Sequence, residues 1–225
     1  MKASELITHL KHKGTERNKE GMARFGINTE TAVGVSVTEL RRLAKNIGMH
    51  HNLAFDLWRS DIHEARILAG MLEDPNRVTE RQMDEWARDF DSWDVCDQVC
   101  SNLFDKTPFA HKKAVEWSSR KEEFVKRAGF VLMACMAVHD KHAKREMFMR
   151  FFPIIVREST DERNFVKKAV NWALRQIGKR SLTLNREAIR VCDEIAKIDS
   201  PSAKWIASNA KWELTSEAVQ KRLTE

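Results

Sequence analysis

The sequence predicts an all-α protein made of stacked helical repeats. Two near-identical segments, Glu123–Ala128 and Asn164–Ala169, lie 41 residues apart, and each carries an aromatic residue, two basic residues and a small residue in the same order. The chain has only four prolines and eight glycines in 225 residues, and after residue 36 its apolar residues follow helical spacing. A period near 40 residues is typical of HEAT-like and armadillo-like helix pairs. We therefore expect a curved, right-handed solenoid of such pairs.

The first 50 residues are less regular than the rest of the chain. The segment Gly26–Gly34 is expected to interrupt any helix there and to form a loop before Ser36, because it contains two glycines and few helix formers. We therefore predict a single domain over residues 1–225, with an irregular helical cap at 1–50 and repeats at 51–225.

Helix starts within this domain are marked by a capping residue followed three positions later by Glu or Gln. Four such pairs occur in order along the chain: Ser36 and Glu39, Asp61 and Glu64, Thr79 and Gln82, and Ser159 and Glu162.

Small residues recur among the apolar segments and are expected where two helices approach closely. They are Ala65, Cys96, Ala128, Ala169 and Ala207. Their uneven spacing is typical of degenerate HEAT-like repeats rather than of a strict consensus array.

The positive charge is concentrated in the middle of the chain. The whole chain carries a net charge of +6, whereas residues 120–180 contain 15 Lys or Arg against 7 Asp or Glu, a surplus of 8. A basic row repeated along a solenoid favours an anionic partner, with nucleic acid the first candidate. The alternative is a solvated helix face.

Other functional classes find little support. The four cysteines, Cys96, Cys100, Cys135 and Cys192, match no zinc or disulfide pattern. His63-Glu64 is not followed by the second histidine of a zinc protease motif. We expect no metal, no cofactor and no membrane span, and a reducing, cytoplasmic location.

Two tryptophans are paired with polar residues at helical spacing. Trp93 and Asp97 are four positions apart and would share one helix face, and Trp172 is followed by Arg175. Tryptophans at such places more often belong to the core. Their association with the basic repeats favours a functional role.

These segments carry a family resemblance. Trp93-Asp94-Val95-Cys96-Asp97, Phe124–Ala128 and Phe165–Arg175 resemble the AlkD family of DNA alkylation repair proteins, from about residue 50 to the end of the chain. The resemblance implies a HEAT-like fold and a monofunctional DNA glycosylase that releases N3- and N7-alkylated purines from duplex DNA without flipping the base.

The resemblance also implies roles for individual residues. Asp97, Trp93 and Trp172 match catalytic positions, and Arg127 matches a further active-site position that we assign to DNA binding. Arg175 matches a DNA-contacting arginine, and Lys126, Lys167 and Lys168 are expected to hold the flanking phosphates.

The N-terminal region departs from the family pattern. Characterised glycosylases of the family use a tyrosine there to hold the lesion strand, whereas this chain has no tyrosine. Phe25 is the residue that can replace it. The sequence therefore resembles a shorter branch with a reduced N-terminal region.

Two other functions remain open at this point. One is a non-catalytic HEAT-repeat protein that recognises DNA structure or damage, and the other is a HEAT adaptor for proteins. For the enzyme, the expected partner is alkylated double-stranded DNA, and the expected state is a monomer.

Overall fold

The computed structural model describes residues 2–224, and these contain fifteen α-helices, one short 3₁₀ helix and no strand. The all-α prediction is therefore confirmed. The chain divides into two compact units, Met1–Thr107 and Pro108–Glu225. The single-domain boundaries, and the hand and curvature of the solenoid, stay predictions.

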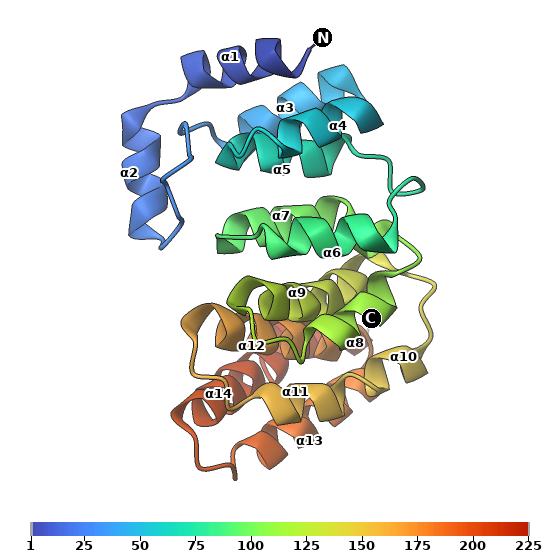
Figure 1. Ribbon diagram of the computed structural model, residues 1–225. Coiled ribbons are helices and arrows are strands. Elements are labelled where there is room, and N and C mark those ends of the chain that lie inside the picture. Colours follow the sequence, from blue (N-terminus) through green and yellow to red (C-terminus); the bar gives the residue numbers. More distant parts are fainter. Residues whose placement is uncertain (1, 225) are drawn as a thin grey trace. The chain divides into compact units, whose positions relative to one another are not determined.

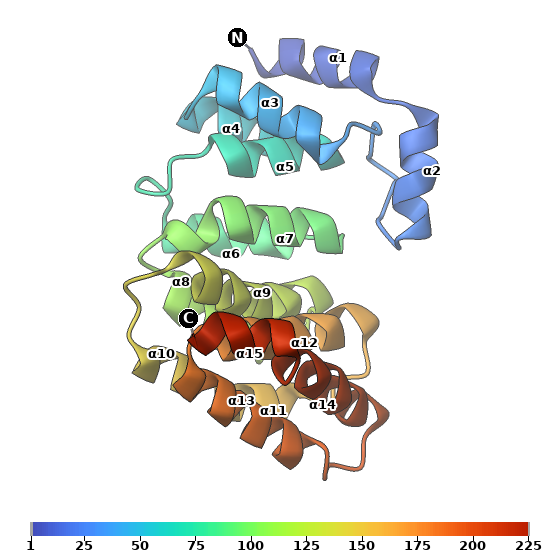
Figure 2. The ribbon, with the colours of Figure 1, turned by 180° about the vertical axis from the view of Figure 1, so that it is seen from behind.

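The first unit contains seven α-helices and the 3₁₀ helix (Figures 1 and 2). They are α1 (Ala3–Lys13), α2 (Glu16–Arg24), α3 (Val37–Ile47), α4 (His51–Trp58), α5 (His63–Leu72), α6 (Glu80–Arg88), α7 (Trp93–Asn102) and η1 (Phe104–Lys106).

Helix α5 lies at the centre of this unit, in contact with α3, α4 and α7. Its residues Ala65, Leu68 and Ala69 are fully buried. Helix α6 joins α4 through the stacked indoles of Trp58 and Trp86, whose ring centroids are 4.0 Å apart. The outcome is a tightly packed stack of helices that supports α7.

The second unit contains the remaining eight α-helices. They are α8 (Ala110–Trp117), α9 (Glu123–His139), α10 (Arg145–Met149), α11 (Phe152–Glu158), α12 (Asn164–Gly178), α13 (Leu182–Ile195), α14 (Pro201–Leu214) and α15 (Glu217–Thr224).

Helices α9, α12 and α14 follow one another in a row, with α9 against α12 and α12 against α14. Each of these three helices also contacts the α-helix that precedes it in the chain: α9 contacts α8, α12 contacts α11, and α14 contacts α13. Gly129 allows a close contact between α9 and the end of α8, since a Cβ there would lie 2.6 Å from the backbone nitrogen of Ser118.

The 41-residue repeat corresponds to the beginnings of α9 and α12. Phe124 and Phe165 occupy equivalent positions in the two segments, and their ring centroids are 5.7 Å apart. The five small residues expected at helix contacts are all buried. Equivalent positions of successive repeats therefore stack on one another.

Two of the four predicted helix starts are confirmed. Ser36 and Thr79 are N-caps, and their hydroxyl oxygens accept from the backbone N–H of Glu39 and Gln82. The other two are wrong. Helix α5 begins after Ile62 rather than Asp61, and Ser159 ends α11 instead of starting α12.

The first 50 residues contain α1, α2 and α3. The predicted loop lies between α2 and α3, and Ser36 caps the helix that follows it. Helix α2 contributes no buried residue. Its apolar residues are therefore available to line a surface site.

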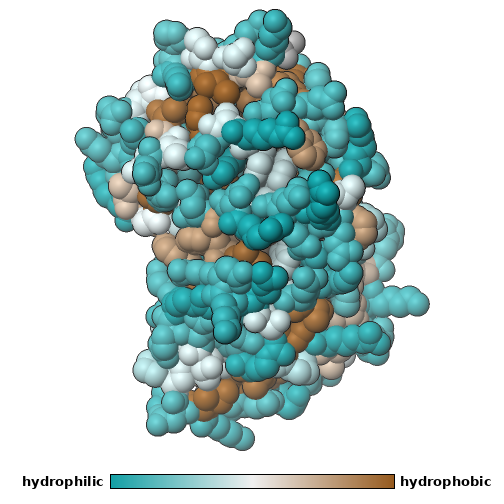
Figure 3. Space-filling model, viewed as in Figure 1, coloured by the Kyte–Doolittle hydropathy of each residue, from teal (hydrophilic) through white to brown (hydrophobic). Residues whose placement is uncertain are grey.

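Polar side chains cover most of the face shown in Figure 3, and hydrophobic side chains form small separate patches there. Among residues 2–224, no helix has both the length and the apolar run that crossing a bilayer requires.

Candidate nucleic-acid interface

Helix α7 presents Trp93 and Asp97 on one face, one turn apart, and both side chains are half-buried. The opposite face, with Val95, Cys96 and Val99, is fully buried. Amphipathic packing of α7 therefore fixes which side chains remain accessible to a partner.

The orientation of the Trp93 indole is set by a contact with the loop that follows α2. Its Nε1–H donates to the carbonyl oxygen of Phe25 at 3.1 Å. Phe25 itself is 74% exposed. The first unit thus contains three of the predicted site residues, Phe25, Trp93 and Asp97. The Phe25 backbone carbonyl is hydrogen-bonded to the Trp93 indole.

The loop between α2 and α3 is also fastened to the start of α7. The Asn28 side-chain amide donates to Asp91 Oδ2 at 2.9 Å, and its backbone N–H reaches Ser92 Oγ at 3.4 Å. These bonds connect residues more than 60 positions apart in the chain. They cannot be read from local sequence.

A buried polar pair involves Asp94, the residue that follows Trp93 in α7. His63 Nε2 is 2.8 Å from Asp94 Oδ2, and the Ser92 hydroxyl donates to Asp94 Oδ1 at 2.7 Å. Burial opposes protonation of His63, but the hydrogen bond and charge of Asp94 outweigh it, so the pKa of His63 is raised. Burial likewise opposes ionisation of Asp94, yet His63 and Ser92 hold its pKa below the usual value.

Glu64 anchors the other end of the same loop. Its carboxylate accepts backbone N–H bonds from Val33 at 2.9 Å, Gly34 at 2.6 Å and Val35 at 3.1 Å. The residue is only 1% exposed. Successive N–H groups around one anion form a nest, and here the anion is the protein's own carboxylate.

A cavity of about 350 Å³ lies between α2 and the α3–α5–α7 face. Its lining is mainly apolar and includes Met22, Phe25, Ile67 and Trp93, with His63 also at its wall. Trp93 therefore lies on the accessible face of α7 and also lines this cavity.

In the second unit, Arg127 is 6% exposed, and its Nη1–H donates to the Phe165 carbonyl oxygen at 2.6 Å. This bond joins the start of α9 to the start of α12. Arg127 is thus fixed in position by the neighbouring repeat.

Lys126 has two carboxylate partners. Its Nζ is 2.6 Å from Glu158 and 3.2 Å from Asp161, and Arg163 holds Asp161 from the other side. Burial opposes ionisation of Asp161, but Arg163 and Lys126 keep the pKa of this carboxyl below its usual value. The predicted phosphate contact by Lys126 stays a prediction, and its charge is already balanced within the protein.

Lys167 and Lys168 differ from Lys126. The Nζ of Lys167 lies over the indole of Trp205, 5.6 Å from the ring centroid, and Lys168 is exposed. A cation over an indole keeps its net charge. These lysines therefore leave positive charge at the start of α12.

Trp172 is half-buried on α12, one turn before Arg175. Arg175 Nη1 is 2.8 Å from Glu213 Oε2, and Lys179 contacts the other oxygen of the same carboxylate. Glu213 thus compensates part of the charge of Arg175. Contact between Arg175 and DNA stays a prediction.

The chain's seven tryptophans fall into three groups. Trp58, Trp86 and Trp117 are core residues, Trp205 and Trp212 are exposed, and Trp93 and Trp172 are intermediate. Neither predicted site tryptophan therefore belongs to the fully buried core.

Sequence reasoning found none of the contacts that His63, Glu64 and Trp205 make in the structure. Trp205 could have been found, because it lies two positions before Ala207, the last of the recurring small residues. The partners of His63 and Glu64 are about 30 positions away, and no local pattern indicates them. Within residues 2–224, no cluster of three or more His, Cys, Asp or Glu side chains is arranged to hold a metal ion.

Comparison with known proteins gives a family match and a match to a solved structure. A family model described as DNA alkylation repair enzyme matches residues 6–203. No curated protein sequence matches the chain. A solved structure matches with a TM-score of 0.80 and 19% identity, over 99% of this chain and 96% of that one. It represents "a new family of proteins related to the HEAT-like repeat DNA glycosylases with affinity for branched DNA structures". This match confirms the HEAT-like fold.

Proposed function

The chain belongs to the DNA alkylation repair enzyme family, and we propose that it hydrolyses the N-glycosidic bond of cationic N3- and N7-alkylated purines in duplex DNA, without base flipping. The observation that carries the proposal is the pairing of Trp93 with Asp97 on the accessible face of α7, with the indole held by the Phe25 carbonyl.

The chemistry of the lesion suits these residue types. Alkylation at N3 or N7 gives the purine a positive charge, so the base already departs readily. As the bond breaks, positive charge develops on the deoxyribose, as in glycoside hydrolysis. The Asp97 carboxylate would stabilise this charge and orient the attacking water.

The indoles would act on the same charge. The face of an indole attracts a cation by roughly 0.5–2 kcal/mol. Trp93 is proposed to contact a cationic nucleotide in this way, and Phe25 to contact the lesion strand. Trp172, in the second unit, is proposed as a further indole with the same type of interaction. None of these contacts requires a metal or an organic cofactor.

In the second unit, Lys167, Lys168 and Arg127 are proposed to bind phosphates, together with Arg175. Such contacts provide affinity and register without sequence preference. Lys126 belongs to the same proposal, and in the unbound protein Glu158 and Asp161 balance its charge.

The catalytic proposal is tested by release of 3-methyladenine or 7-methylguanine from methylated duplex DNA. We expect Asp97→Asn to abolish release while DNA binding persists. Asp56→Asn is the matched control, because Asp56 is an exposed carboxylate on α4 of the same unit. Absence of release by folded wild-type protein at high concentration refutes the proposal.

The phosphate contacts are tested by the salt dependence of DNA binding. Lys168→Gln should lower the slope of log K against log salt by about one. Arg186→Gln, which removes an exposed charge from α13, should leave the slope unchanged. Equal slopes for all three proteins would exclude Lys168 from the interface.

A second candidate function is recognition of branched DNA without bond cleavage. The solved relative with affinity for branched DNA favours it. In that case the protein would bind a four-way junction more tightly than a duplex of equal length, and Asp97→Asn would leave this preference unchanged.

A further inference from the structure

A second cation-rich site lies in the second unit, at the opposite end of α9 from Arg127; its nearest link to the proposed DNA contacts is Lys179, which shares the Glu213 carboxylate with Arg175. It is a cavity of about 620 Å³ at the carboxyl-terminal ends of α9 and α12. Arg127 lies near the start of α9 and Ala137, which lines the cavity, near its end. At 1.5 Å per residue, these positions are about 15 Å apart along the helix.

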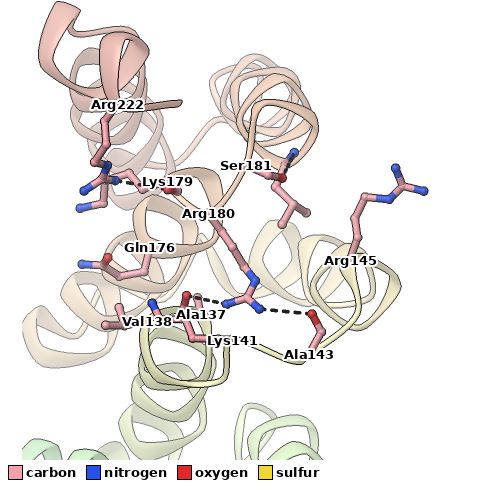
Figure 4. Close-up of a pocket in the computed structure, with 11 residues that line it drawn as sticks. Ala137, Val138, Lys141, Ala143, Arg145, Gln176, Lys179, Arg180, Ser181 and Arg222 are labelled. Carbon is pink, nitrogen blue, oxygen red and sulfur yellow. Dashed lines mark hydrogen bonds between the residues drawn. The ribbon is translucent and has the colours of Figure 1, made fainter. Parts of the chain in front are cut away.

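Five of the residues that line this cavity are basic and none is acidic. The basic residues are Lys141, Arg145, Lys179, Arg180 and Arg222. They come from four parts of the unit: the α9–α10 loop, α10, the α12–α13 connection and α15 (Figure 4).

Only part of this charge is balanced by the protein. Arg145 pairs with Glu146 at 3.1 Å and Lys179 with Glu213 at 2.5 Å. Within the described part of the chain, no carboxylate forms an ion pair with Lys141, Arg180 or Arg222. The cavity therefore keeps a positive charge that an anion can compensate.

Arg180 is held rigidly at the wall of the cavity. Its guanidinium donates to the carbonyl oxygens of Ala137 at 3.0 Å and Ala143 at 3.2 Å, and it lies over the ring of Phe148 at 4.5 Å. A guanidinium has five N–H donors, so two are used here and three remain. A cation fixed in place loses little conformational freedom when it binds a ligand.

A helix amino terminus meets the same cavity. Ser181, the N-cap of α13, lines it. The positive end of the helix dipole adds to the charge of the side chains. The cavity volume of about 620 Å³ also suits a small ligand, since small-ligand sites commonly occupy about 300–1,000 Å³.

We propose that this cavity is a binding site for phosphate groups, separate from the proposed glycosylase site. Guanidinium and ammonium groups around one concavity, with no acidic residue in its lining, match the charge and the acceptor oxygens of a phosphate ester. The site does not require Asp97. The phosphate belongs either to the end of a nucleic-acid strand or to a free phosphorylated molecule.

The first test measures binding of inorganic pyrophosphate by calorimetry. Wild-type protein is expected to bind it saturably, and the double variant Lys141→Gln, Arg222→Gln to bind at least ten-fold more weakly. Both side chains are exposed, and circular dichroism verifies that the variant is folded.

The matched control is the double variant Arg186→Gln, Lys197→Gln, which removes one arginine and one lysine from exposed positions outside the cavity. It should bind pyrophosphate within two-fold of wild type. No saturable binding by wild type, or equal weakening in both double variants, overturns the proposal.

The second test identifies the source of the phosphate. A 5′-phosphorylated single-stranded 12-mer is compared with the same strand bearing a 5′-hydroxyl. A preference for the phosphorylated strand that disappears in the Lys141→Gln, Arg222→Gln variant assigns the site to strand ends. Pyrophosphate binding without such a preference assigns it to a free phosphorylated molecule. Asp97→Asn should retain pyrophosphate binding, which separates this result from that of the base-release assay.

Discussion

Replacing Glu64 with Gln tests how the buried carboxylate organises the loop that carries Phe25. Both Glu64 oxygens face backbone donors, Oε2 facing Val33 N–H and Oε1 facing those of Gly34 and Val35. A glutamine keeps one acceptor oxygen and presents an NH₂ group where the second oxygen was. One N–H of the loop would then face another donor.

The cost can be worked from these three bonds. Loss of one hydrogen bond to a charged acceptor costs about 1.5–3 kcal/mol, and the two remaining bonds weaken from charged to neutral, by roughly 0.5–1 kcal/mol each. Relief of the buried charge returns part of this energy. We expect a net local loss of about 2–3 kcal/mol.

Amide hydrogen exchange at residues 33–35 measures this loss directly. At about 1.4 kcal/mol per factor of ten, exchange there should accelerate by roughly 30- to 150-fold. Glu39→Gln is the control, because it changes a carboxylate of α3 that pairs with the exposed Arg42, and it should leave these amides protected.

The same substitution also tests the link to function. The loop supplies the Phe25 carbonyl that orients Trp93, so base release should fall together with amide protection. If Glu64→Gln leaves protection of residues 33–35 within three-fold of wild type, the argument that Glu64 anchors the loop is refuted.

Two further predictions concern the same unit. Gly34 has φ +85°, and a Cβ there would lie 2.3 Å from the backbone oxygen of Thr15; Gly34→Ala should destabilise the protein by roughly 2–3 kcal/mol or more. Gly48 has φ +76° with nothing within 4 Å of its Cβ position, so Gly48→Ala should lose less stability than Gly34→Ala when both are unfolded in urea. Equal stability losses in the two variants would contradict the predicted clash between residue 34 and Thr15. The second prediction is a pH dependence. The pKa of His63 is raised above 6.5, so the stability that His63 contributes is complete below pH 6.5 and is lost as the pH rises through the folded-state pKa. The pKa of Asp94 is lowered below 3.8, so the stability that Asp94 contributes is present above pH 3.8 and is lost as the pH falls through the folded-state pKa. The urea midpoint should therefore be highest between about pH 4 and 6.5 and should decline toward pH 9, whereas in Asp94→Asn the alkaline decline should be reduced; a wild-type midpoint that is constant from pH 6 to 9 would contradict the assigned pair.

The sequence by itself determined the helical class and the repeat. The paired segments at Phe124 and Phe165 indicate a period, and the two phenylalanine rings lie at equivalent, adjacent positions of α9 and α12. Capping at Ser36 and Thr79 was also predictable, because the acceptor and the donor are three residues apart. Helical periodicity and capping act over a few residues, so local sequence indicates them; Asp61 and Ser159 carry the same capping pattern without starting a helix, because the pattern alone does not fix where a helix begins.

Only the tertiary structure decided which lysines of the basic repeats keep a positive charge that the protein's own carboxylates do not balance. Lys126 and Lys168 are both part of the basic repeats, yet Lys126 is balanced by Glu158 and Asp161, whereas Lys168 is exposed. The anchoring of the Phe25 loop by Glu64 and the burial of His63 against Asp94 likewise join residues about 30 positions apart. Electrostatic pairing depends on distance in space, which periodicity along the chain does not specify.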